Sequence, residues 1–109
     1  MTKQSHSNVN GLNKELHRQI LDKILSYKDV EKIVLYGSRA TDTFRKTSDI
    51  DIAVFAENWT SRDIALVHDS LEENVKTPLK IDLVNFYAIT KESLKENILK
   101  QGVILYESK

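Results

Sequence analysis

The stretch that decides the fold runs from Leu35 to Phe55 and reads LYGSRATDTFRKTSDIDIAVF. A hydrophobic run ends at Gly37-Ser38, and after a polar segment of ten residues Asp49 and Asp51 are set into a second hydrophobic run. Short apolar runs bounded by turn residues predict buried strands. Two carboxylates within such a strand need a reason other than packing.

Strand geometry predicts where these carboxylates point. Successive side chains of a strand alternate between the two faces of a sheet, so Asp49 and Asp51 share one face. The residues between and after them, Ile50, Ile52 and Val54, point to the other face. We therefore expect the aliphatic face to meet the helices and the carboxylate face to be open.

A third strand repeats the pattern in LKIDLVNF, residues 79–86. Ile81 and Leu83 are expected to face the core, and Asp82 then points to the opposite face. Taken alone, Asp82 is equally consistent with an exposed charge on an edge strand. If the second and third strands are neighbours, Asp49, Asp51 and Asp82 converge on one face.

The rest of the chain supplies helices and one more strand. Leu12, Leu16, Ile20 and Ile24 recur every four residues and predict a helix over 11–27. A second helix follows the loop ENWT, with Thr60 or Ser61 as its N-cap, and a short third helix is expected from Thr90 to Gly102. VILY, residues 103–106, is the last strand. This order predicts an α/β (α+β-like) fold, a single small mixed sheet of about four strands with helices on one face.

Size and composition predict one soluble domain. The chain has 109 residues, with 16 basic and 16 acidic side chains, so its formal net charge is zero and favours neither a nucleic-acid nor a membrane partner. It has no cysteine, which excludes disulfides and thiolate metal sites and is compatible with a cytoplasmic location. Residues 1–10 are polar, lack the apolar core of a secretory signal, and are expected to form a flexible tail before a domain over 11–109.

Three clustered carboxylates repel one another and are tolerated best beside a cation. Oxygen ligands suit Mg²⁺, which binds one or two carboxylates together with substrate phosphates. Two such ions would activate an attacking oxygen and stabilise a leaving pyrophosphate. We therefore expect Asp49, Asp51 and Asp82 to form a metal site.

The Gly-Ser pair predicts an anion site beside the metal. Gly37 ends a strand, and free backbone N–H groups in the turn that follows would bind phosphate. Gly lets the backbone approach closely, and the hydroxyl of Ser38 adds a donor. Arg39 could pair with a phosphate or lie in solvent.

The segment GSRATDTFRKTSDIDIAV resembles the signature of the nucleotidyltransferase superfamily, and the size of the chain is similar to that of the minimal nucleotidyltransferases, the MNT or MntA-like group. The resemblance implies that Gly37 and Ser38 hold the triphosphate, that Asp49 and Asp51 bind Mg²⁺, and that Asp82 helps activate an acceptor hydroxyl. It also implies an antitoxin that transfers AMP from ATP to a tyrosine of a helical HEPN-type toxin. One departure is Asp42, where family members often have Gly.

Two other functions fit the same residues. A non-enzymatic antitoxin would neutralise its partner by covering it, although the intact acidic triad argues against that as the sole role. A nucleotidyltransferase with a small-molecule or RNA acceptor is the other alternative, and the absence of a basic-aromatic pattern makes RNA the weaker choice. A homo- or hetero-oligomer is compatible with each of these functions.

Overall fold

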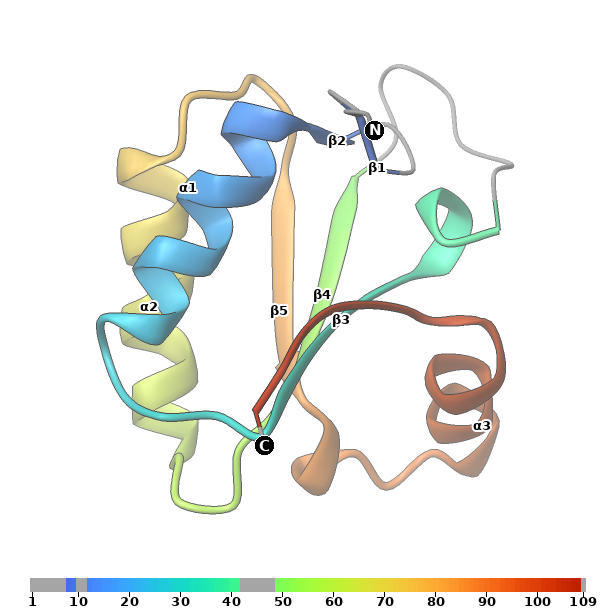
Figure 1. Ribbon diagram of the computed structural model, residues 1–109. Helices are drawn as coiled ribbons and strands as arrows, with labels where there is room; N and C mark the ends of the chain where they lie inside the picture. The colour runs from blue at the N-terminus through green and yellow to red at the C-terminus, as the bar shows by residue number, and fades with distance from the viewer. Residues whose placement is uncertain (1–7, 10–11, 42–48, 109) are drawn as a thin grey trace.

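The computed structural model describes residues 8–9, 12–41 and 49–108, and within them the strands form a mixed four-stranded sheet (Figure 1). The strand order is β5-β4-β3-β6, in which β4 runs parallel to β5 and antiparallel to β3, and β6 is antiparallel to β3. The strands are β3 (Lys32–Tyr36), β4 (Ile50–Phe55), β5 (Ile81–Asn85) and β6 (Val103–Glu107). The predicted α/β class and mixed sheet are confirmed.

A small strand pair precedes the sheet. β1 (Asn8–Val9) pairs antiparallel with β2 (Leu12–Asn13), an element that the sequence pattern did not predict. Most of the predicted tail over 1–10 lies outside the described residues.

Three helices connect the strands: α1 (Lys14–Leu25), α2 (Ser61–Asn74) and α3 (Glu92–Gln101). Thr60 caps α2 in a reciprocal capping box with Asp63, as the predicted start of that helix requires. The predicted cap of α3 at Thr90 is wrong, because the N-cap is Lys91 and no side chain bonds the first turn. Gly102 ends α3 as expected. None of the described helices is long and apolar enough to cross a membrane.

One face of the sheet packs against α1 and α2 and forms the main core (Figure 1). The strands contribute alternate residues to it, as their period of two requires. These residues include Ile33, Leu35, Ile50, Ile52, Val54, Ile81 and Leu83, all buried. The helices contribute Leu16, Ile20 and Ile24 from α1 and Val67 and Leu71 from α2.

The prediction that the helices lie on one face holds for α1 and α2 but is wrong for α3, which packs on the opposite face (Figure 1). There Ile98 of α3 joins a second buried cluster with Val34 and Phe55. The physical reason is that β3 and β4 are apolar on both faces near this end, and such strands need cover on both sides. Gly102 permits the close approach, since a Cβ there would collide with Val34 Cγ1 and the Ile98 carbonyl oxygen.

Candidate active site

Asp51 and Asp82 lie in one row across the sheet, and we call these two residues together with Asp49 the carboxylate row. In the strand register Tyr36 of β3 pairs with Asp51 of β4, and Asp51 pairs with Asp82 of β5. Residues paired in this way point to the same face, so the predicted neighbourhood of Asp51 and Asp82 is borne out by the strand pairing. Asp49 immediately precedes β4 and is exposed.

β5 is the edge strand of the sheet and Asp82 is exposed on it, as the simpler interpretation of this residue also expected. What distinguishes Asp82 from an ordinary edge charge is its partner. A carboxylate directly opposite another carboxylate is an unfavourable cross-strand pair, so packing alone would not select Asp51 opposite Asp82.

Burial and the neighbouring carboxylates disfavour the ionised form of Asp51. Its pKa is raised from 3.8, first because the side chain is partly buried and then because the charges of Asp82 and Asp49 repel its ionised form. The carboxylate row is therefore an arrangement that a bound cation would relieve.

Gly37 brings the backbone against Asp51. Its φ is +79°, in the left-handed region that favours glycine, and it begins the short 3-10 helix η1 (Gly37–Arg39) directly after β3. A Cβ at this position would collide with Oδ2 of Asp51. The glycine thus has two separate reasons to be present, a backbone conformation and a close approach to a carboxylate.

Tyr36 forms the boundary between the carboxylate row and the apolar cluster under α3. It is only 8% exposed and belongs to the same cluster as Val34 and Phe86. Burial, together with the charges of Asp51 and Asp82, raises the pKa of Tyr36 to about 12. Its phenol therefore stays protonated at neutral pH.

Ser38 and Arg39 follow in η1. Arg39 is 2% exposed, which rules out the solvent-exposed alternative for this side chain, and burial lowers the pKa of its guanidinium. Ser38 is partly buried. Asp42 lies outside the described residues. The turn after β3 and the starts of β4 and β5 bring six candidate residues to one end of the sheet: Gly37, Ser38, Arg39, Asp49, Asp51 and Asp82.

The donor set suits Mg²⁺ more than a softer metal. Asp49, Asp51 and Asp82 offer only hard oxygen ligands. Within residues 8–9, 12–41 and 49–108, no three His, Cys, Asp or Glu side chains are grouped so as to hold a metal ion, so the expected site of Asp49, Asp51 and Asp82 is not present as a group of three ligands. A site of one or two carboxylates completed by substrate phosphates is the arrangement that Mg²⁺ usually takes.

Sequence reasoning missed a second role for α2 at the edge of the sheet. Glu72 accepts a hydrogen bond from the Ile81 N–H at 3.0 Å, and Nε2 of His68 lies 2.8 Å from the Ile81 carbonyl oxygen. These contacts satisfy the N–H and C=O groups of Ile81 that point away from β4, next to Asp82. They therefore prevent another strand from pairing with the sheet edge at this residue. The i, i+4 spacing of His68 and Glu72 on α2 was the available signal.

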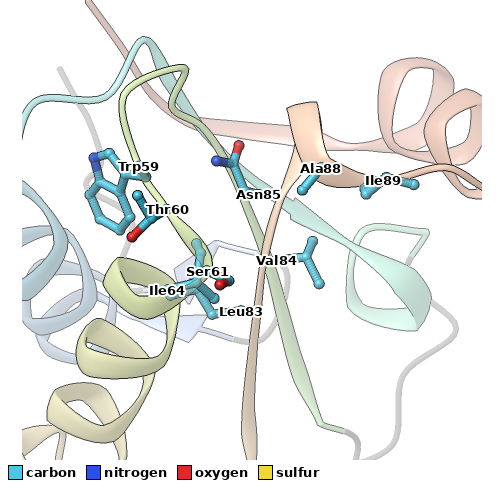
Figure 2. Close-up of a pocket in the computed structure, with 9 residues that line it drawn as sticks. All are labelled: Trp59, Thr60, Ser61, Ile64, Leu83, Val84, Asn85, Ala88 and Ile89. Atoms are coloured by element: carbon cyan, nitrogen blue, oxygen red, sulfur yellow. The ribbon is translucent and has the colours of Figure 1, made fainter.

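An apolar pocket of about 310 Å³ lies apart from the carboxylates (Figure 2). It opens between the start of α2 and the last residues of β5, with Ile64 and Val84 on facing walls. Trp59 lines it but is itself 6% exposed, donates its indole N–H to the Asp29 carbonyl oxygen at 3.1 Å, and packs edge-on against Tyr27. Trp59 is therefore a packing residue.

Comparison with known proteins agrees with this geometry. Residues 18–109 match the family described as Polymerase beta, Nucleotidyltransferase, and no protein of curated function matches the sequence. A toxin–antitoxin crystal structure with AMP-PNP is 23% identical, with a TM-score of 0.72 over 85% of this chain and 74% of that one. An MntA-HepT toxin–antitoxin structure is 20% identical, with a TM-score of 0.69 over 88% and 74% of the two chains.

The mixed sheet, with Gly37 against Asp51, is the arrangement expected of a nucleotidyltransferase. The chain belongs to the nucleotidyltransferase family, since the family match spans most of its length. The resemblance predicted from Gly37-Ser38 and Asp49-x-Asp51 is thereby confirmed, and the fold is that of the solved MntA structures.

Proposed function

We propose that this nucleotidyltransferase is Mg²⁺-dependent and transfers AMP from ATP to a hydroxyl group, most directly that of a tyrosine on a HEPN-type toxin. The family match gives the class of reaction. The pairing of Asp51 with Asp82 beside Gly37 is the observation that carries the location of the chemistry. The toxin–antitoxin pairs of similar fold, one of them with AMP-PNP, support ATP as donor and a toxin as partner.

In this proposal Asp49 and Asp51 would hold Mg²⁺ and Asp82 would complete the site, with two ions as the expected number. Bound Mg²⁺ would supply charge neutralisation of the triphosphate and polarisation of the reacting phosphate. The backbone N–H groups at Gly37 and Ser38, together with the Ser38 hydroxyl, bind the triphosphate. Arg39, buried in the same turn, adds positive charge on the phosphate side.

Asp82 receives the proton of the acceptor hydroxyl, because it is the exposed member of the paired carboxylates and can be reached by an approaching protein. The acceptor oxygen forms a bond to the α-phosphorus of ATP. The bond from that phosphorus to the oxygen bridging to the β-phosphate breaks, and pyrophosphate leaves. The products are the adenylylated hydroxyl and pyrophosphate.

The partner has a structural task as well. Asp49 and Asp82 are both exposed, and a bound toxin would cover this end of the sheet and exclude water from the reacting phosphate. We propose that the domain spans 11–109, that 1–10 is a flexible tail, and that the pair works in the cytoplasm as an oligomer of antitoxin with toxin.

The test is the intact mass of a HEPN-type toxin after incubation with the chain, ATP and Mg²⁺. The control is the Asp49→Asn, Asp51→Asn double variant. We expect a gain of whole AMP units on the toxin with the unaltered chain and none with the control. A toxin left unmodified but inhibited equally by both forms would refute transfer and show that the chain acts by masking. Transfer to an added RNA or small molecule instead would refute the protein acceptor.

A further inference from the structure

The end of the sheet opposite the carboxylate row is hollowed. Two adjoining hollows, of about 460 and 200 Å³, share Glu31, Phe55 and Ser108 in their walls, and we call them together the distal groove. They lie where β4 and β6 end, at the lower end of the sheet in Figure 1. Asp51 is the second residue of β4 and Phe55 the last, so roughly 13 Å of strand separates the row from the groove at about 3.3 Å per residue.

The distal groove is acidic, although the whole chain has a formal net charge of zero. Its walls carry the exposed carboxylates Asp29, Glu31, Glu57 and Glu107. Among the described residues that line it, Lys32 is the only basic side chain. The local excess of negative charge would attract and orient a basic group before contact.

Aromatic rings form the floor and one wall of the groove. Phe55 and Phe86 stack with their centroids 4.3 Å apart, and Tyr87 meets both rings edge-on at 5.8 and 5.9 Å. Tyr87 is 47% exposed, and its hydroxyl donates to Oε1 of Glu31 at 2.6 Å. An exposed tyrosine held rigidly beside a carboxylate is a typical anchor of a protein interface.

The rings already receive a cation from within the chain. Nζ of Lys32 lies 4.6 Å from the centroid of Phe55, a cation–π distance. The hydrogen bond to Glu31, followed by burial and the charges of Glu31 and Glu57, raises the pKa of Tyr87 to about 12. Tyr87 therefore remains neutral at physiological pH.

We propose that the distal groove docks an arginine side chain presented by a basic segment of a partner protein. A planar guanidinium stacks on an aromatic ring and at the same time donates two hydrogen bonds to a carboxylate, which matches Tyr87 beside Glu31. A lysine ammonium would satisfy the charge but not the paired geometry. This docking goes beyond the proposed transfer reaction, because it uses none of the residues of the carboxylate row.

The test uses the whole chain, labelled with ¹⁵N, and three heptapeptides with blocked ends that alternate glycine with arginine, lysine or glutamate. We expect the arginine peptide to shift the amide signals of Glu31, Phe55, Tyr87 and Glu107 and to bind several-fold more tightly than the lysine peptide. The glutamate peptide is expected to give no shifts. Arginine-peptide shifts centred on Asp49, Asp51 and Asp82, or no shifts at all, would overturn the proposal.

A pair of variants separates docking from general attraction. Glu31→Gln with Glu57→Gln removes two groove charges and leaves an acceptor oxygen for Tyr87, whereas Glu73→Gln with Glu96→Gln removes two exposed charges elsewhere. We expect the groove variant to bind the arginine peptide about five- to tenfold more weakly, and the control variant to change binding less than about twofold at 0.15 M salt. Equal weakening by both variants would refute a specific site.

Discussion

Replacing Gly37 with alanine perturbs the backbone turn and the carboxylate row together. The residue has a φ of +79°, and an added Cβ would collide with Oδ2 of Asp51. Both effects follow from one methyl group. We therefore expect Gly37→Ala to lower both the stability of the fold and the rate of nucleotidyl transfer.

The magnitude has two parts. A left-handed conformation costs an L-residue about 1–2 kcal/mol, and displacement of Asp51 from its rotamer adds about 0.5–1.5 kcal/mol. A loss near 2–3 kcal/mol lowers the Tm of a domain of this size by roughly 10–20 °C. The Asp51 carboxylate must move by on the order of 1 Å, and a misplacement of that size reduces transfer about 100-fold.

The assay pairs thermal unfolding with transfer of the α-phosphate label of ATP to the toxin, measured well below each Tm. Gly102→Ala is the matched control, because its Cβ would collide with Val34 and Ile98 at a normal φ of −68°. It precedes β6, which lies on the other side of β3 from the strands that carry the carboxylates. We expect a stability loss of about 1–3 kcal/mol in the control, with transfer per folded molecule unchanged. A folded Gly37→Ala protein that transfers AMP at the unaltered rate would refute the assigned role of this turn.

Three further predictions concern charge and capping. Asp51→Asn should raise the free energy of unfolding at pH 7, because it removes a partly buried charge that Asp82 repels. The same substitution should lower transfer at least about 100-fold. Unchanged stability in a urea titration would contradict the stability prediction. Thr60→Ala should cost about 1 kcal/mol through loss of the α2 cap, visible as a lower urea midpoint at unchanged slope. The pKa of Asp63 is lowered, first by the hydrogen bond from Tyr27, so its stabilisation is present above the unfolded pKa near 3.8 and is lost as pH falls below it. Asp63→Asn should therefore flatten the acid limb of stability against pH, and an unaltered limb would refute this assignment.

The strands and the common face of Asp51 and Asp82 could be predicted because both depend on local alternation. The apolar runs KIVLY and DIDIAVF predicted the positions of β3 and β4. The alternation of side chains along each strand predicted that Asp51 and Asp82 point to the same face. Thr60, one of the two predicted N-caps, likewise marked the start of α2. These features are determined within a few residues of chain, where sequence pattern is most informative.

The position of α3 could not be read in the same way. Its apolar residues Leu94 and Ile98 fit either face of the sheet, and the choice depends on Phe86 stacking on Phe55 across two strands. The unbroken apolar run of β3 was the available sign that both faces are covered. The burial of Arg39 likewise depends on how the turn after β3 packs, which the sequence does not encode locally.

The measurement that tests the central claim most directly is paramagnetic broadening of the ¹⁵N-labelled chain by Mn²⁺ in the presence of a non-hydrolysable ATP analogue. If the carboxylate row is the nucleotide and metal site, the amide signals of Gly37, Asp51 and Asp82 broaden first. The same titration on the Asp49→Asn, Asp51→Asn variant should leave these signals sharp. Broadening that centres on the distal groove around Glu31 and Glu107, or that persists unchanged in the variant, would contradict the assignment of the active site.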